Sequence, residues 1–510
     1  MAKFISPEEA AALVNDNDIL ATEGFVRNMF PEQLACALEE RFLKTGSPKN
    51  LTLIYAAGQA DLNHLGHEGL LKRVIGGHWN LSPNLGKLAV ENKIEAYNLP
   101  QGTIAQLFRD TAAGKVGTVT HVGLKTFVDP RLDGGKLNSA TKEDIVEVVT
   151  LGGREQLLYK AHRPNCCFLR GTCADEKGNI SFESEGVTLG ALSIAQAVKA
   201  NGGKVIVQVG KVVKAGSIDS KSVRIPHIYV DAVVEVPFEK NMTEALPGMI
   251  DVHAGMKKIP TSSLPPLPLD ERKIIGRRCA FELTPNAIVN LGIGVPEAVA
   301  MVANEEGIGD YMTLTVEAGP VGGVPAGGGL FGCSVNPDCI LDQAYQFDFY
   351  DGGGLDLAYL GLAECDEKGN INVSKMGPRI TGCGGFINIT QNAKRLFYCG
   401  TFTAKGLKVK AENGKLSIEQ EGSVKKFLKK VGHVTFSGEY AVQTGQPVLY
   451  ITERAVFELQ KDGLHLIEVA PGIDIEKDIL QHMEFKPVIK GQPKLMDARI
   501  FKSEPVGLVK

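Results

Sequence analysis

The chain has 510 residues, of which 44% are hydrophobic and 22% are charged, as is ordinary for a globular protein of two domains. Its formal net charge is −4 and its basic residues form no blocks, which argues against a nucleic acid partner. The first residues resemble no signal peptide and no window is apolar for long enough to cross a bilayer, so we expect a cytoplasmic protein without a membrane partner.

The cysteines show no pattern that would create a metal site. The ten cysteines are dispersed, and adjacent Cys166 and Cys167 form the only close pair. The sequence has no Cys-x-x-Cys motif and no histidine at the spacing of a zinc ligand. We therefore expect reduced, buried thiols, no metal and no tightly bound cofactor.

In the first half of the chain, apolar runs alternate with helical segments. Residues 19–25 predict a strand followed by a glycine turn, and Pro31 opens the next helix. Further on, residues 189–199 have a helical pattern, and residues 204–209 form an apolar run that ends at Gly210. This alternation is typical of parallel strands covered by helices.

A proline-rich segment divides the chain. The prolines of residues 257–270 can neither continue a helix nor donate to a strand ladder, so this segment predicts an extended linker. We therefore predict an N-terminal domain over residues 1–258, a linker over residues 259–270 and a C-terminal domain over residues 271–510. The C-terminal domain would carry the catalytic residue described below.

An internal repeat relates the two halves. The segment Ala174-Asp-Glu-Lys-Gly-Asn-Ile180 recurs almost unchanged as Cys365-Asp-Glu-Lys-Gly-Asn-Ile371. Asp and Gly at these positions suit a hairpin turn, so we assign the motif a structural role. The strand, glycine turn and proline of residues 19–31 are also echoed by residues 287–296. The predicted fold class is therefore α/β, with two related open-sheet domains.

Glu317 is the strongest catalytic candidate. It follows an apolar run at residues 311–316, which predicts a strand, and it precedes a glycine-rich loop. Ligands collect at the carboxyl ends of parallel strands, and a carboxylate there can act as a nucleophile if nearby donors stabilise the charge created by its attack. By itself, a glutamate in such a turn is more often a solvated surface carboxylate.

Two other loops offer donors for that charge. Gln101 lies in a strand-end loop that we interpret as the first-half counterpart of the Glu317 loop, which would bring the two side chains together in a cleft between the domains. The glycines of residues 382–386 let backbone N–H groups approach a ligand, and either Gly384 or Gly385 could be the donor. The alternative for each loop is an ordinary turn.

These features resemble family I coenzyme A transferases over nearly the whole chain, and in particular the single-chain propionate and acetate CoA-transferases. The matching motifs are Leu99-Pro-Gln101-Gly-Thr103, Asn290-Leu-Gly-Ile-Gly-Val-Pro296, Glu317 with Gly319, Gly322 and Gly323, Gly382-x-Gly-Gly-Phe386, and residues 451–457 and 468–474. The chain departs from the ketoacid-type members, which have Ser-Glu-Asn-Gly where this sequence has Val-Glu-Ala-Gly. That difference favours small monocarboxylates over succinyl or acetoacetyl groups.

The resemblance implies two domains of the CoA-transferase, or NagB/RpiA-like, type and a role for each candidate residue. Glu317 would attack the thioester of an acyl-CoA and pass through an acyl-glutamyl anhydride to a glutamyl-CoA thioester, so CoA would be a covalently held substrate. Gln101 and either Gly384 or Gly385 would stabilise the oxyanion. The implied assembly is a homo-oligomer, and we take a tetramer as the working guess.

Four further glycines are expected to lie against CoA: Gly292, Gly294, Gly322 and Gly323. The first two precede a helix predicted to begin near Pro296. The rest of a Gly-x-Gly-x-x-Gly motif is missing there, so we do not expect NAD.

The expected activity is ping-pong transfer of CoA from a short-chain acyl-CoA to a free carboxylate such as acetate, propionate, butyrate or lactate. An acyl-CoA hydrolase could use the same glutamate with water as the final acceptor. A different possibility is a small-molecule sensor that has the fold but no activity.

Overall fold

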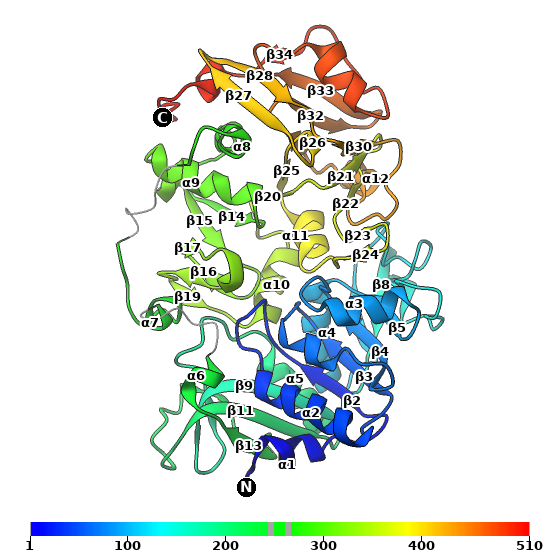
Figure 1. The fold of residues 1–510 in the computed structure, drawn as a ribbon, viewed down its shortest axis with the longest axis vertical. Helices are drawn as coiled ribbons and strands as arrows, with labels where there is room; N and C mark the ends of the chain where they lie inside the picture. Colours follow the sequence, from blue (N-terminus) through cyan, green and yellow to red (C-terminus); the bar gives the residue numbers. More distant parts are fainter. Residues whose placement is uncertain (1, 243–248, 261–266, 509–510) are drawn as a thin grey trace. The chain divides into compact units, whose positions relative to one another are not determined.

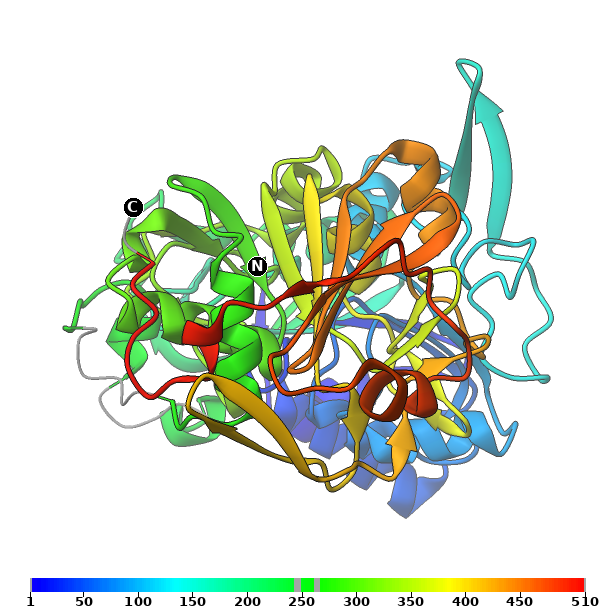
Figure 2. The same cartoon turned by 90° about the horizontal axis from the view of Figure 1, so that it is seen from above.

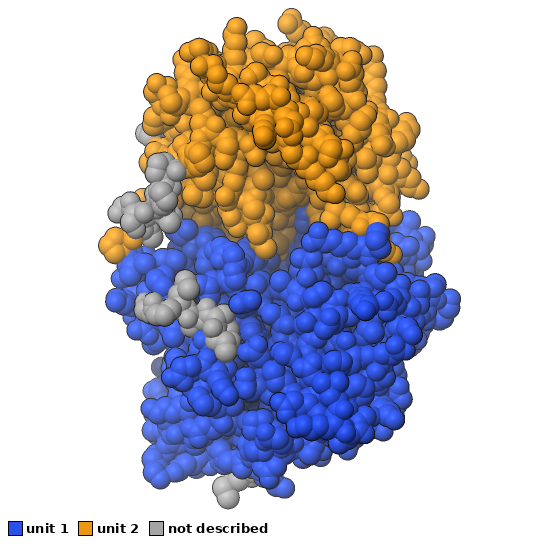
Figure 3. All heavy atoms as spheres, in the orientation of Figure 1, with its two compact units in different colours: residues 1–259, 316–348, 378–388 blue, residues 260–315, 349–377, 389–510 orange. Residues whose placement is uncertain are grey.

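The structure is a computed structural model that describes residues 2–242, 249–260 and 267–508. It divides into two compact units, shown in different colours in Figure 3. Unit 1 comprises Met1–Ile259, Val316–Asp348 and Pro378–Asn388, and unit 2 comprises Pro260–Thr315, Phe349–Gly377 and Ile389–Lys510. Part of the predicted linker, residues 261–266, lies outside the described residues, and the domain boundaries stay a prediction.

Unit 1 contains a large sheet whose eight main strands are all parallel (Figure 1). In spatial order they are β1 (Lys3–Phe4), β13 (Ala232–Glu235), β11 (Lys204–Val213), β9 (Cys166–Asp175), β2 (Ile19–Thr22), β3 (Leu51–Tyr55), β4 (Leu71–Gly76) and β5 (Glu95–Asn98). The short strands β10 (Ile180–Ser181) and β12 (Val223–Ile225) extend it next to β9. Every residue of β9 is buried, as expected for a central parallel strand covered on both faces.

Helices cover both faces of this sheet. The helices in the first segment of unit 1 are α1 (Pro7–Ala12), α2 (Glu32–Thr45), α3 (Pro83–Val90), α4 (Gln101–Ala112), α5 (Ala191–Ala200), α6 (Phe238–Asn241) and α7 (Ile250–His253). Helices α1, α2 and α3 share a core with side chains such as Leu20, Leu53 and Phe168. Neighbouring residues in the same strands, such as Leu169 and Val207, point to the opposite face of the sheet and are buried there, where α5 packs against β9 and β11.

A smaller antiparallel sheet also belongs to unit 1. Its strands are β6 (Gly117–Thr120), β8 (Arg154–Lys160) and β7 (Val146–Leu151), in this spatial order. Strands β7 and β8 form a hairpin, and Figure 2 shows it in cyan, projecting beyond the large sheet of unit 1. The turn between them contains Gly152 and Gly153, both with positive φ, as a two-residue hairpin turn of type I′ requires.

Unit 2 is built around a second sheet. Its strands within unit 2, in spatial order, are β15 (Met312–Thr315), β14 (Ala287–Leu291), β20 (Leu357–Gly361), β25 (Arg395–Cys399), β31 (Val448–Ile451), β32 (Ala455–Gln460), β33 (Gly463–Val469) and β34 (Lys494–Leu495). The strands from β15 to β31 are parallel, whereas β32 runs antiparallel to both of its neighbours. Helices α8 (Glu271–Ala280) and α9 (Ala298–Glu305) pack in the core of this unit together with residues of these strands.

The remaining elements of the second half are short. They include α10 (Gln343–Asp351), α11 (Phe386–Asn392), α12 (Gly438–Thr444), β16 (Pro320–Val321), β17 (Val324–Pro325), β18 (Ser334–Val335), β19 (Cys339–Ile340), β21 (Glu364–Asp366), β22 (Ile371–Asn372), β27 (Lys408–Glu412), β28 (Lys415–Gln420) and β30 (Phe427–Leu428). Strands β16 to β19 form two antiparallel pairs in the segment that follows Glu317. The mixed α/β class with open parallel sheets is as predicted.

The repeated Asp-Glu-Lys-Gly-Asn motif forms the same turn in each unit, between β9 and β10 and between β21 and β22. In the first copy, Asp175 accepts hydrogen bonds from the backbone N–H groups of Lys177 and Asn179 and from the Asn179 side chain. In the second copy, Asp366 accepts the same three bonds from the residues two and four positions further on. Both turn glycines have positive φ, so the structural role predicted for the motif is confirmed.

Candidate active site

Glu317 stands in a tight loop just after β15. The backbone N–H of Val316 donates to the carbonyl of Pro320 at 2.9 Å, and the N–H of Gly319 donates to the carbonyl of Val316 at 3.0 Å. Gly319 has φ +129°, and a Cβ there would lie 2.1 Å from the carbonyl oxygen of Leu341. Only glycine fits this position, and the loop it permits leaves Glu317 half-buried.

Gln101 is the first residue of α4 and is buried. Like Glu317, it belongs to unit 1. Its backbone N–H donates to the carbonyl of Gly384 at 2.9 Å. Its side-chain Nε2 donates to Oε1 of Gln343 at 3.3 Å, which leaves the second N–H of that amide for another acceptor. The side chain is therefore both anchored and able to donate.

The glycine loop of residues 382–385 is joined to the ends of β4 and β5. The backbone N–H of Gly384 donates to the carbonyl of Gly77 at 2.7 Å, and the N–H of Cys383 donates to Oδ1 of Asn98 at 2.9 Å. Gly382 and Gly384 both have positive φ. These bonds fix the loop beside Gln101.

The glycine loop also meets Glu317. A Cβ on Gly385 would lie 3.4 Å from Cγ of Glu317 and 3.1 Å from Cζ of Phe347, and a Cβ on Gly384 would lie 3.6 Å from Oε1 of Gln101. The four predicted catalytic residues are therefore neighbours in unit 1. Of the two glycines, Gly384 already uses its N–H for Gly77, whereas Gly385 shows no such bond among the described residues.

The sequence analysis did not predict two residues that lie next to this site, Gln343 and His78. Gln343, which holds the Gln101 amide, lies 242 residues further along the chain, and no local motif marks it. His78 pairs in a short bridge with Gly382, and its ring lies next to Gly384. Burial lowers the pKa of His78 to about 4, so its imidazole is neutral at physiological pH.

The predicted equivalence of the Gln101 and Glu317 loops is wrong. Gln101 follows β5, at the edge of its sheet, whereas Glu317 follows β15, which lies directly beside β14. Judged from the neighbouring strands, β15 corresponds to β3. Residues 316–348 and 378–388 lie in the second half of the chain but belong to unit 1, and this brings the two side chains together. An internal repeat in the sequence does not reveal that segments of the second half belong to unit 1.

The four glycines expected near CoA occupy two places. Gly322 and Gly323 have positive φ, and any Cβ there would clash with Asp338 and Val335, so local packing already requires glycine at both positions. Gly292 and Gly294 follow β14 in unit 2, and Gly294 has φ +88° with open space around it. A role of these glycines in CoA binding stays a prediction.

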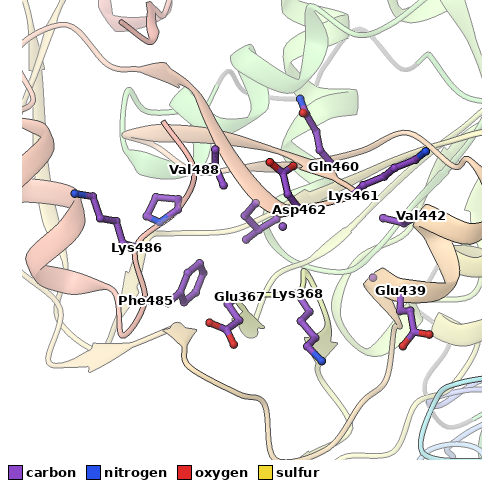
Figure 4. A pocket seen from close by; sticks show the side chains of 14 residues that line it. Glu367, Lys368, Glu439, Val442, Gln460, Lys461, Asp462, Phe485, Lys486 and Val488 are labelled. Atoms are coloured by element: carbon purple, nitrogen blue, oxygen red, sulfur yellow. The ribbon is translucent and has the colours of Figure 1, made fainter. Parts of the chain in front are cut away.

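A separate cavity of about 470 Å³ lies in unit 2 (Figure 4). Lysine and acidic side chains from the second Asp-Glu-Lys-Gly-Asn turn, α12, the β32–β33 turn and residues 485–488 line it. It contains no predicted catalytic residue. Across the described ranges, no cluster of three His, Cys, Asp or Glu side chains could hold a metal ion, and no helix is both long and apolar enough to span a bilayer.

Comparison with known proteins identifies the family of this chain. The coenzyme A transferase family model matches residues 4–236. Acetate CoA-transferase YdiF of Escherichia coli strain K12 is 45% identical over 511 residues, covering 99% of this chain and 96% of that protein. Caffeate CoA-transferase of Acetobacterium woodii is 45% identical over 520 residues, covering 100% of this chain and 99% of that protein.

Solved structures show the same similarity. The crystal structure of the acyl-CoA transferase YdiF apoenzyme from Escherichia coli O157:H7 has 44% identity and a TM-score of 0.94, and the match covers 100% of this chain and 98% of that one. The thioester complex of YdiF with CoA has 43% identity and a TM-score of 0.93, over the same shares of the two chains.

A glutamate beside amide donors, in a loop that follows a parallel strand, is an arrangement suited to acyl transfer. The full-length similarity shows that this chain belongs to the family I coenzyme A transferases. It is an enzyme that transfers CoA between an acyl-CoA and a carboxylate. The predicted family and enzyme class are confirmed.

Proposed function

We propose that the enzyme transfers CoA from a short-chain acyl-CoA to acetate, propionate, butyrate or lactate, with Glu317 as the nucleophile. The observation that carries this proposal is the meeting of Glu317, Gln101 and Gly385 around one loop of unit 1. The Val-Glu-Ala-Gly sequence at residues 316–319 supports small monocarboxylate substrates. The 45% identity to an acetate CoA-transferase fits such substrates, but the chain is equally similar to a caffeate CoA-transferase, so identity alone does not select the acid.

The first half of the reaction forms the enzyme thioester. A carboxylate oxygen of Glu317 attacks the thioester carbon of the acyl-CoA, and the carbon–sulfur bond breaks to give an acyl-glutamyl anhydride and the CoA thiolate. The thiolate then attacks Cδ of Glu317, and the first acid leaves as its carboxylate. In the second half, a new carboxylate repeats these steps in reverse order, so the kinetics are ping-pong.

Each attack creates an oxyanion, for which the site offers two donors. The N–H of Gly385 and the second amide hydrogen of Gln101 are suited to this role, because Gln343 and Gly384 hold Gln101 in place. We assign Gly385 rather than Gly384, whose N–H donates to Gly77. Exchange of one thioester for another needs neither ATP nor a metal.

Chemical trapping tests the nucleophile. Incubation with acyl-CoA followed by borohydride should modify Glu317, as located by peptide mass spectrometry. The Glu317→Ala variant should lose CoA transfer by a factor on the order of a thousand or more, because no covalent intermediate can form. Glu91→Gln, at the exposed end of α3, is the control and should retain wild-type transfer.

A Glu317→Ala variant with normal transfer, or a thioester trapped on another residue, would refute the assignment. Release of CoA without an acceptor acid, measured with the same protein, would indicate the hydrolase instead. A sensor would show no turnover with any acyl-CoA. The cytoplasmic location and the homo-oligomeric state stay predictions.

A further inference from the structure

Glu23 is a buried carboxyl group without a catalytic role in the reaction described above. It follows β2 directly, at the carboxyl end of the strand, and is 2% exposed. Its Oε2 accepts a hydrogen bond from the backbone N–H of Gly190 at 3.2 Å. Its Oε1 has no hydrogen-bond partner within the part of the chain that the structure describes.

Glu23 holds a proton at neutral pH. Burial raises its pKa to about 8, and the negative charge of Asp342 acts in the same direction. Asp342 itself is paired with Arg224 at 3.6 Å. Oε2 accepts the N–H of Gly190, so we assign the proton to Oε1, which is then an O–H donor with no acceptor among the described residues.

Gln343 provides a second donor of this kind. Its side chain is fully buried, its Oε1 accepts the bond from Gln101, and its Nε2 has no partner among the described residues. Its backbone N–H donates to the carbonyl of Leu189, the residue before the Gly190 that binds Glu23. The consecutive residues Leu189 and Gly190 therefore bind the Gln343 backbone and the Glu23 side chain. The Gln343 side chain in turn binds Gln101.

We propose that the Glu23 carboxylic acid and the Gln343 amide donate hydrogen bonds to the carboxylate of the acceptor acid and so position it for attack on the enzyme thioester. A carboxylate has only acceptor atoms and thus matches two unpartnered donors. One of its oxygens receives these bonds and the other remains free to attack Cδ of Glu317. This inference rests on the proposed function and assigns its acid-binding residues.

The test isolates the second half-reaction. The enzyme–CoA thioester is prepared with acyl-CoA, freed of the first acid by gel filtration and mixed with increasing acetate concentrations in single-turnover experiments. Glu23→Gln keeps a neutral donor and should leave the half-saturating acetate concentration within about twofold of wild type at pH 7. Glu23→Met, of similar length but without a donor, should raise it at least about tenfold.

The pH profile gives a second readout. In the wild type, ionised Glu23 repels the carboxylate, so the half-saturating acetate concentration should rise as pH increases above about 8. Glu23→Gln should show no such rise between pH 7 and 9.5. A purely structural role of Glu23 would not produce this difference.

The outcomes separate this inference from the proposed function. If the wild type forms no thioester, the proposed function fails. If the thioester forms but Glu23→Met binds acetate normally, or Glu23→Gln keeps the alkaline rise, only the acid-binding role is overturned. Should Glu23→Met fail to fold, the pH profile of the isosteric Glu23→Gln variant decides alone.

Discussion

At the scale of single residues, the choice of amino acid follows from what surrounds each position. Gly319 permits the loop that leaves Glu317 half-buried, and Gly385 lets the glycine loop approach that glutamate. The sequence analysis chose Glu317 and the glycine pair from local patterns, and it chose Gln101 from a loop equivalence that proved wrong and from the family resemblance. It could not separate Gly384 from Gly385, because the carbonyl of Gly77 that engages one of them is contributed by a remote segment.

Gly385→Ala tests the close approach at this loop. The new methyl group would lie 3.1 Å from Phe347 and 3.4 Å from Cγ of Glu317, so one of them must move. We expect the transfer rate to fall roughly a hundredfold through misplacement of the nucleophile, with little change in folding. Gly86→Ala is the control, because a methyl group at this position in α3 meets no other atom. Equal rates for the two variants would contradict the model of the site.

At the scale of elements, the strands and hairpin turns were predictable because short-range patterns encode them. The apolar run at residues 204–209 is part of β11, and the repeated motif gives two turns with matching hydrogen bonds. The grouping of the Glu317 segment with unit 1 was not predictable, because it depends on contacts between residues far apart in sequence.

The two repeated turns should contribute to stability and not to catalysis. Asp175→Ala and Asp366→Ala each remove the three hydrogen bonds within the turn and a fourth from a more distant backbone N–H, that of Gly216 or Val431. We expect each variant to lower the free energy of unfolding by about 1 to 3 kcal/mol. Urea denaturation measures this change. Asp366→Asn keeps an acceptor oxygen and should cost less, and a loss of turnover per folded molecule would argue against a purely structural role.

At the scale of the whole molecule, each unit contains its own hydrophobic core. The core of unit 1 lies between its parallel sheet and helices α1 to α3, and that of unit 2 is formed with α8 and α9. The internal repeat and the alternation of apolar runs with helices predicted this α/β architecture. The resemblance extended the prediction to the enzyme family, which the full-length relatives confirm.

Core packing should dominate the stability of unit 1. Leu53→Ala removes a side chain that is fully buried in β3 and should lower the free energy of unfolding by about 2 to 5 kcal/mol. Leu43→Ala, in α2 with 64% exposure, is the matched control and should change it by less than about 0.5 kcal/mol. Similar losses for the two variants in chemical denaturation would contradict the assigned core.

The sequence by itself determined the secondary structure, the repeated turns and the identity of the nucleophile candidate, because periodicity, glycine and proline act over a few residues. Only the tertiary structure decided what surrounds that nucleophile. Gln343 reaches Gln101 across 242 residues, and Glu23 becomes a neutral acid only through burial. Such long-range contacts and the desolvation they cause depend on the folded chain as a whole, and no local pattern records them.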